Sequence, residues 1–173
     1  MKRTHKCREV TSDLIGKEIS VSGWIHRRRD HGGVIFFDLR DEDGLVQVVY
    51  NPESKDTFTL AETCRNEYVI FSTGIVRERP EGTANESLLT GHLEVIASDL
   101  IIINSSLPTP FQLDEYSSVG EETRLKYRFL DLRRSEMQDN LRPRSRVSAS
   151  LRSYLDKENF VEIETPLLTK ATP

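Results

Sequence analysis

Apolar and polar residues alternate along five stretches of the chain, and this alternation is the pattern of β-strands that bury one face. The stretches are Lys17 to Arg29, Val34 to Arg40, Leu45 to Tyr50, Tyr68 to Arg77 and His92 to Asn104. Glycine-containing segments separate the first three stretches and predict tight turns between them. We therefore expect a mainly β domain in the N-terminal part of the chain.

Three glycine positions add detail to this expectation. His31-Gly32-Gly33 predicts the turn between the first two strands. The run Asp41-Glu42-Asp43-Gly44 predicts a hairpin in which the Asp-Gly pair takes a positive φ. Gly23 stands inside the first strand and predicts a bend or a β-bulge there.

One helix is expected between the third and the fourth strand. It covers Ser54 to about Cys64, because Phe58, Ala61 and Cys64 recur at helical spacing. Five strands with a helix between the third and the fourth is the order of an OB-fold barrel. Such a barrel closes its sheet and leaves the face of its second and third strands for oligonucleotides.

The chain changes character after the fifth strand. Pro108 and Pro110 exclude a helix or a central strand, so residues 105–122 are expected to form a semi-stiff linker. The sequence thus predicts an OB-fold domain at 1–104 and the start of a second domain at 123–173.

The predicted second domain contains one long helix-like segment, Ser135 to Asn159, with Val147 and Leu151 on one face. Pro143 predicts that this helix starts or kinks near Arg142. Val161 to Glu164 alternates like a strand.

Composition limits the classes of function. The chain has 173 residues, 36% of them hydrophobic and 30% charged, without an apolar run long enough to span a membrane. Residues 1–6 are basic but are not followed by an apolar segment, so we expect no signal peptide and a cytoplasmic protein. Cys7 and Cys64 stand far apart in unlike contexts and are interpreted as free thiols. The carboxylates from Asp41 to Asp43 are explained by the turn, so no metal site is expected.

Three consecutive arginines precede the first turn and suggest a site for a polyanion. A sheet core cannot hold unpaired cations, and period-two alternation places Arg27 and Arg29 on one face and Arg28 on the other. If the apolar face of the next two strands is core, Phe36 and Gln47 are displayed outward. Arginines beside a ring and an amide suit single-stranded RNA. Since the net charge is −4, binding would have to be local, and the alternative is a simply solvated basic run.

Three segments, in order, resemble one known family. The run from Gly23 to Val49, GWIHRRRDHGGVIFFDLRDEDGLVQVV, looks like the anticodon-binding domain of bacterial aspartyl-tRNA synthetases. Leu125 to Arg134 and Phe160 to Lys170 resemble the same family. The last segment is similar to motif 1 of class II aminoacyl-tRNA synthetases, whose helix and strand form a dimer interface around a proline, here Pro166. Residues 123–173 would then be the beginning of an α+β catalytic domain.

The resemblance implies roles for particular residues. By motif, the residues that would contact the anticodon are Arg27, Arg29, Phe36, Gln47, Arg77, Arg79 and Glu94. In this family a histidine at His31, with a glycine in the loop after the fourth strand, here Gly82, resembles the non-discriminating type that also charges tRNA(Asn).

The resemblance also implies an activity for the full-length enzyme. It would be an aspartate–tRNA ligase that acts on tRNA(Asp), uses ATP and Mg²⁺, and forms a homodimer; no DNA or membrane partner is expected. The segment at hand would bind neither ATP nor Mg²⁺ and would contain no catalytic residue, because motifs 2 and 3 would lie beyond Pro173. Two alternatives remain: a free-standing OB-fold protein that binds single-stranded nucleic acid, and the N-terminal domain of a lysyl- or asparaginyl-tRNA synthetase.

Overall fold

The computed structural model describes residues 2–113 and 118–168. The chain forms two compact units, Met1–Pro110 and Phe111–Pro173. Among the described residues, no helix is long and apolar enough to cross a membrane.

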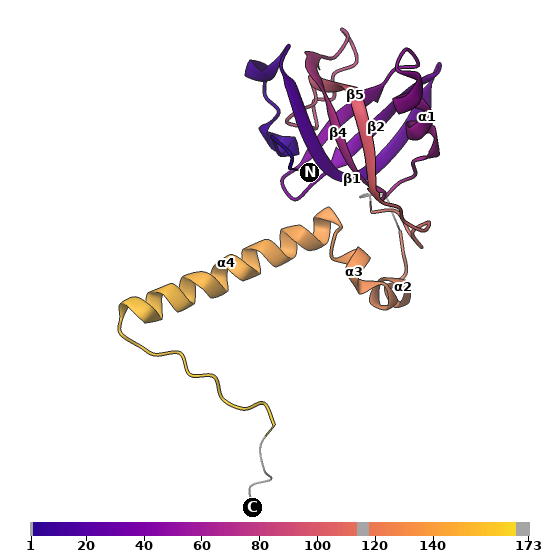
Figure 1. The fold of residues 1–173 in the computed structure, drawn as a ribbon. Helices are drawn as coiled ribbons and strands as arrows, with labels where there is room; N and C mark the ends of the chain where they lie inside the picture. Colours follow the sequence, from indigo (N-terminus) through magenta and orange to yellow (C-terminus); the bar gives the residue numbers. More distant parts are fainter. Residues whose placement is uncertain (1, 114–117, 169–173) are drawn as a thin grey trace, which may run out of the picture. The chain divides into compact units, whose positions relative to one another are not determined.

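The first unit is a five-stranded closed barrel (Figure 1). Its elements are β1 (Glu18–His31), β2 (Val34–Arg40), β3 (Leu45–Tyr50), α1 (Lys55–Thr63), β4 (Val69–Glu78) and β5 (Leu93–Asn104), preceded by the 3₁₀ turns Cys7–Glu9 and Ser12–Leu14. The strands follow one another around the barrel as β1-β2-β3-β5-β4, and β4 pairs with β1 to close it. All pairs are antiparallel except β3 with β5. The predicted strands, the helix between β3 and β4 and the OB-fold class are confirmed.

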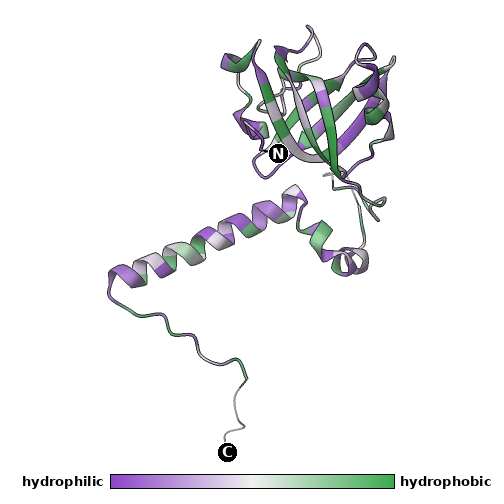
Figure 2. Ribbon diagram, in the orientation of Figure 1, coloured by the Kyte–Doolittle hydropathy of each residue, from purple (hydrophilic) through white to green (hydrophobic). Residues whose placement is uncertain are grey.

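Alternating side chains build the core of this barrel. Buried and partly exposed residues follow each other strictly along β2 and through the first half of β1, and Figure 2 shows hydrophilic and hydrophobic residues in succession along the strands. Ile35, Phe37 and Leu39 of β2 are fully buried. Burying a side chain of this kind stabilises the fold by roughly 1.5–3 kcal/mol.

The predicted bend or bulge at Gly23 is wrong in position. The register shift between β1 and β2 lies between Ile25 and Arg27, whereas Gly23 pairs regularly with Ile70 of β4. Glycine is needed at position 23 for a different reason: a Cβ there would lie 2.2 Å from the carbonyl oxygen of Arg40. The bulge brings Arg27 opposite Asp38 on β2.

The two turns are held in different ways. Gly32 and Gly33 take positive φ angles of 62° and 82°, which side-chain-bearing residues rarely adopt. Gly44 has no positive φ, so the prediction for the Asp-Gly pair is wrong. This second turn is held instead by the carboxylate of Asp41, which accepts the backbone N–H groups of Asp43 at 2.9 Å and Gly44 at 3.0 Å.

The second unit contains α2 (Glu121–Lys126), α3 (Arg128–Asp131) and α4 (Ser135–Lys157). Phe111 and Leu113 are buried and pack with Leu130 of α3. Asp131 is fully buried and accepts hydrogen bonds from Arg128 and Arg134. Part of the stretch that was expected to be a linker therefore belongs to a small core.

The helix α4 runs without interruption through Pro143 (Figure 1). The predicted start or kink near Arg142 is wrong. A proline inside a helix leaves the carbonyl of the residue four positions before it without its usual partner. That residue is Asp139, which is exposed, so water can satisfy its carbonyl.

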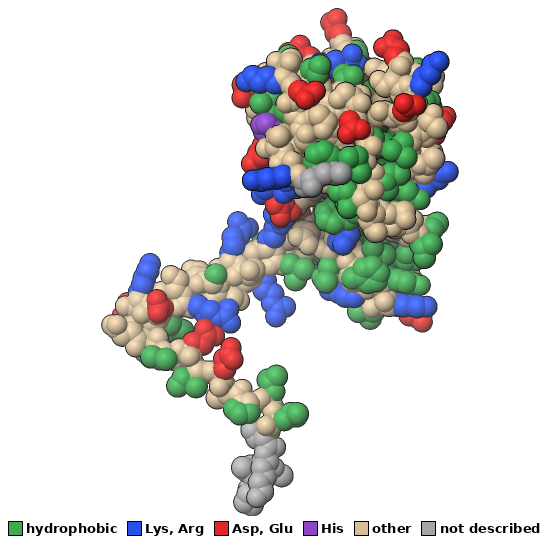
Figure 3. Space-filling view, in the orientation of Figure 1, with side chains coloured by type: hydrophobic (Ala, Val, Ile, Leu, Met, Phe, Trp, Pro, Cys, Tyr) green, Lys and Arg blue, Asp and Glu red, His purple; other side chains and the backbone are tan. Residues whose placement is uncertain are grey.

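The predicted strand at Val161 to Glu164 is also wrong within the described residues: this segment has no regular secondary structure. A strand needs a neighbour to accept its backbone hydrogen bonds, and none of the described strands pairs with it. Hydrophobic side chains stand exposed along α4 and the segment after it (Figure 3), among them Phe160 and Val161, which are 66% and 82% exposed.

Candidate nucleic-acid interface

A groove of about 340 Å³ lies on the outer face of the barrel. Residues of all five strands line it, together with the loop that follows β4. Six of the residues that the sequence singled out line this groove: Arg29, Phe36, Gln47, Arg77, Arg79 and Glu94. His31 lines it as well.

The strand register brings these side chains together. One row of directly opposite residues crosses the five strands: Arg27 of β1, Asp38 of β2, Gln47 of β3, Glu94 of β5 and Arg77 of β4. We call this set the outer row. Neighbours across a strand pair lie about 4.5–5.5 Å apart at Cβ, close enough for side chains to interact. The outer row alternates in charge from a cation to an anion, an amide, a second anion and a second cation.

A chain of hydrogen bonds connects the groove. Arg29 donates to the carboxylate of Asp38 and, at 3.1 Å, to Oε1 of Gln47. Nε2 of Gln47 donates to Oε2 of Glu94 at 2.6 Å, and Nε of Arg77 donates to Oε1 of the same carboxylate at 2.7 Å. Because a cation lies on one side of the amide and an anion on the other, the orientation of Gln47 is fixed.

The prediction that Gln47 is displayed outward is wrong in one respect. Its side chain is on the outer face, but only 5% of it is exposed. Glu94 is even less exposed, at 1%. Burial of these two polar side chains is tolerated because each polar atom has a partner. Gln47 therefore forms the floor of the groove.

Phe36 supplies an aromatic surface in the groove and is only partly buried. The guanidinium carbon of Arg29 lies 5.9 Å from the centre of its ring, within the range of a cation–π contact. The ring of His31 lies 6.2 Å away and is tilted by 56°. A nucleic-acid base that stacks on such a ring gains about 1–3 kcal/mol.

The groove carries more positive than negative charge. Arg29, Arg77 and Arg79 face the carboxylates of Asp38 and Glu94. Arg79 donates through Nε to the carbonyl oxygen of Leu93 at 3.0 Å. Its Nη2 atom is buried and has no hydrogen-bond partner among the described residues. Burial lowers the pKa of Arg79, while Asp38 and Glu94 raise it.

This buried donor leaves one hydrogen-bonding group of Arg79 unused. Unmatched guanidinium nitrogens also occur elsewhere, for example at Nε of Arg28. The indication of an anionic, base-bearing ligand therefore comes from the combination of Arg79 with the half-exposed ring of Phe36.

Three predicted residues lie outside the groove. Arg27 is exposed at one end of the outer row. Gly82 has a positive φ of 79° in the loop between β4 and β5, and its neighbours Pro80 and Thr83 line the groove. Pro166 belongs to the second unit and is exposed. The roles of all the candidate residues stay predictions.

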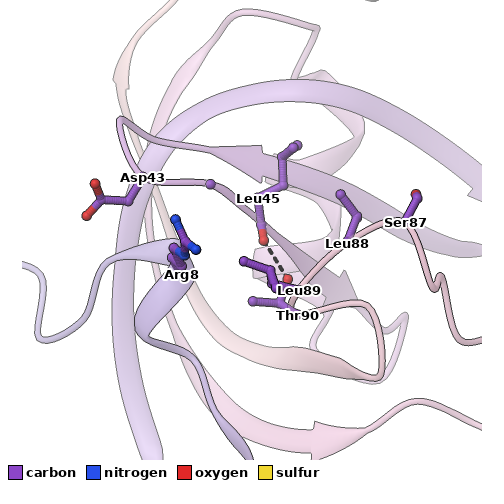
Figure 4. A pocket seen from close by; sticks show the side chains of 8 residues that line it. Arg8, Asp43, Leu45, Ser87, Leu88, Leu89 and Thr90 are labelled. Carbon is purple, nitrogen blue, oxygen red and sulfur yellow. Dashed lines mark hydrogen bonds between the residues drawn. The ribbon is translucent and has the colours of Figure 1, made fainter. Parts of the chain in front are cut away.

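A second cavity, of about 190 Å³, lies between the β2–β3 turn and the loop before β5 (Figure 4). Leu88 and Leu89 line it, with Arg8 as its cation, and Asp43 turns its carboxylate away from the leucines. As far as the described residues show, no aromatic ring lines this cavity. It is therefore less suited to bases than the groove.

Asp38 is the residue that the sequence reasoning missed: it does not line the groove but accepts a hydrogen bond from Arg29, which does. The alternation along β2 placed it on the same face as Phe36, so part of the signal was present. Its partner could not be read from the sequence, because the contact with Arg29 depends on the bulge in β1 and on the fold of the hairpin.

Two family models match this chain. One, described as an OB-fold nucleic acid binding domain, matches residues 19–103, and the other, described as tRNA synthetases class II (D, K and N), matches residues 120–173. The class that the barrel and its groove define is therefore an OB-fold nucleic-acid-binding domain.

Solved structures resemble the chain over most of its length. An asparaginyl-tRNA synthetase from Pyrococcus horikoshii, complexed with asparaginyl-adenylate, is 26% identical with a TM-score of 0.78 over 96% of this chain and 37% of its own. An aspartyl tRNA synthetase from Entamoeba histolytica, at 22% identity, shares the fold with a TM-score of 0.85 over 97% of this chain and 40% of its own. The barrel alone is similar to an OBody bound to hen egg-white lysozyme, with 26% identity and a TM-score of 0.53 over 61% of this chain and 97% of that one.

The chain combines an OB-fold anticodon-binding domain with a fragment of a class II tRNA synthetase of the D, K and N family, named for aspartate, lysine and asparagine. It spans about two fifths of the length of the synthetases that it matches.

Proposed function

We propose that this chain is part of an aspartate–tRNA ligase and that the groove binds the anticodon of tRNA(Asp). The observation that carries the proposal is the half-exposed ring of Phe36 beside a floor of fixed hydrogen-bonding groups, with three arginines around it. A base can stack on the ring while its edge meets the floor. The aspartyl assignment rests on the resemblance of the residues from Gly23 to Val49.

The fixed groups suit the reading of base edges. Gln47 uses one lone pair of its oxygen and one hydrogen of its nitrogen within the groove, so one acceptor site and one donor remain for a base. Both oxygens of Glu94 already have partners. A guanine edge would therefore reach Glu94 by taking the place of Arg77, whose side chain is half exposed.

The full-length enzyme would activate aspartate with ATP and transfer it to the tRNA. ATP and Mg²⁺ supply that chemistry when bound. Within the described residues, no group of three or more His, Cys, Asp or Glu side chains is placed to hold a metal ion. The exposed segment that contains Pro166 would form a homodimer interface in the full-length enzyme.

We further propose that the enzyme is of the non-discriminating type, which accepts tRNA(Asn) as well as tRNA(Asp). His31 lines the groove beside Phe36, and the loop of Gly82 contributes Pro80 and Thr83 to the same groove. Their place in the groove supports a role in the selection of the third base of the anticodon.

Fluorescence anisotropy with RNA stem-loops tests the proposal. Four loops carry the anticodons GUC, GUU, UUU and an unrelated triplet, all at one stated salt concentration. We expect GUC and GUU to bind about equally and more tightly than the other two. Preference for GUC alone would support a discriminating aspartyl enzyme, and preference for GUU or UUU alone would support an asparaginyl or a lysyl enzyme. Equal binding of all four would contradict anticodon recognition and favour a general single-stranded nucleic-acid binder.

Variants locate the binding site in the same assay. Phe36→Leu should weaken GUC binding by about 1–3 kcal/mol through loss of stacking. Arg29→Ala should weaken it as well, whereas the matched control Arg28→Ala should not, because Arg28 points away from the groove and pairs with Asp30. Equal effects of the two arginine variants would contradict the proposed site.

A further inference from the structure

Asp38 places a carboxylate beside a groove that we propose to bind a polyanion: it does not line the groove itself but accepts a hydrogen bond from Arg29, which does. A negative charge there repels phosphates, so its presence costs affinity for RNA. The side chain of Asp38 is 18% exposed and forms an ion pair with Arg29, whose side chain is 33% exposed. The outer row also places it between Arg27 and Gln47.

The contacts of Asp38 fix one arginine in one place. Nη2 of Arg29 donates to both Asp38 and Gln47, and the same guanidinium lies over the ring of Phe36. A flexible arginine could otherwise follow any phosphate that comes near. Held in this way, Arg29 has its charge largely compensated and meets only a ligand that also fits the ring and the amide.

We infer that Asp38 is a positioning residue that gives the groove its triplet selectivity by holding Arg29 and compensating its charge. This inference rests on the proposed anticodon-binding function. Selectivity here is a difference between two affinities, and Asp38 increases it by weakening the binding of RNA that does not fit.

The test compares Asp38→Asn with Asp30→Asn in the 173-residue chain. Both variants remove one negative charge, but Asp30 lies on the same stretch of β1 as Arg28 and pairs with it outside the groove. Binding of the GUC loop and of the unrelated loop is measured between about 50 and 200 mM salt. Trp24, the single tryptophan of the chain, reports whether each variant is folded.

Asp38→Asn should bind the unrelated loop more tightly than Asp30→Asn does, and the ratio of GUC to unrelated binding should fall. Release of one arginine to a phosphate should make the salt slope steeper by about 0.7. The affinity of Asp38→Asn for the unrelated loop, relative to that of Asp30→Asn, should then increase about 2.6-fold when the salt concentration is lowered from 200 to 50 mM. In the double variant Arg29→Ala/Asp38→Asn the gain should disappear, because the effect acts through Arg29.

Several results would overturn the inference. Equal affinities and salt slopes of Asp38→Asn and Asp30→Asn would overturn it. Asp38→Asn could also bind all loops more weakly with an unchanged salt slope; that result would indicate a merely structural role and would overturn the inference as well. A gain that survives in the double variant would exclude action through Arg29. If wild type shows no triplet preference, the proposed function fails and the inference falls with it.

A second variant keeps the test decisive if Asp38→Asn does not fold. Arg29→Gln should weaken GUC binding but leave the salt slope for the unrelated loop unchanged, because a compensated arginine contributes little to non-specific binding. A shallower slope for the unrelated loop in Arg29→Gln would overturn the inference.

Discussion

Replacement of Glu94 by glutamine tests the hydrogen-bond chain beneath the groove. The carboxylate is 1% exposed and accepts from Nε2 of Gln47 at 2.6 Å and from Nε of Arg77 at 2.7 Å. Glutamine has nearly the same shape, but one of its two terminal atoms is an NH₂ group. In either of the two carboxylate oxygen positions, the NH₂ group would face an N–H donor, that of Gln47 or that of Arg77, so one of the two hydrogen bonds is lost.

The expected cost follows from two opposing effects. Hydrogen bonds to charged groups contribute about 1.5–3 kcal/mol each, and one of them is lost. Removal of the charge also relieves the cost of burying a carboxylate, which in some proteins offsets a lost ion pair. Here the loss of the hydrogen bond should outweigh the relief from burying a charge. Glutamine places its buried NH₂ group against another N–H donor and does not replace the ion pair by apolar packing. We expect a loss of about 2 kcal/mol in the free energy of unfolding.

Urea and thermal unfolding measure this loss. Trp24 lies in β1, so its fluorescence follows the barrel and not the second unit. For a domain of about a hundred residues, 2 kcal/mol lowers the midpoint of thermal unfolding by about 8 °C. The matched control is Glu78→Gln, at the exposed end of β4, which should change the free energy by less than about 0.5 kcal/mol. A Glu94→Gln variant as stable as this control, or more stable than wild type, would refute the reasoning.

Two further predictions concern stability. Gly74→Ala should destabilise the barrel by about 1–3 kcal/mol, because the added Cβ would lie 2.2 Å from the carbonyl oxygen of Ile96. Gly44→Ala is the control, since the nearest atom to its added Cβ is 3.6 Å away. Equal midpoints of urea unfolding for the two variants would contradict the argument. Burial raises the pKa of the Cys64 thiol from 9.0 to about 11, so the unfolded chain loses this proton at lower pH than the folded chain. The free energy of unfolding should therefore fall as the pH rises from about 9 to about 11, and it should fall less steeply in Cys64→Ala. Urea unfolding at several pH values in this range measures both proteins. The same pH dependence in wild type and Cys64→Ala would contradict this prediction.

Most polar side chains of the groove already form hydrogen bonds with other residues of the barrel. Arg29 and Arg77 each contact a carboxylate that competes with RNA for them. Binding would thus exchange partners within the groove, and the net gain would be smaller than the sum of the new contacts. This is a reason to expect selective rather than strong binding by the barrel.

Much of the barrel could be predicted because its signals are local. Period-two alternation fixed where β2 and β3 begin and end, since each strand must turn its apolar side chains to one core. The helix α1 followed from apolar residues at helical spacing. The strand order could be inferred from the number and sequence of the elements, because few closed sheets accommodate five strands and one helix.

Other features were beyond local reasoning. The unbroken helix at Pro143 depends on solvent exposure of that turn, and the missing strand at Val161 to Glu164 depends on a partner outside the segment. Gln47 looked like a displayed residue because alternation gives the face of a side chain but not what covers it.

The sequence by itself determined the elements of the barrel, the face on which Phe36 and Gln47 lie, and the resemblance to class II synthetases. Only the tertiary structure decided which residues meet. Glu94 reaches Gln47 because β5 is inserted between β3 and β4 as a parallel neighbour of β3, and Asp38 stands opposite Arg27 because β1 carries a bulge after Ile25. Pairings of this kind join residues that are far apart along the chain, so they depend on strand order and register, which local patterns do not encode.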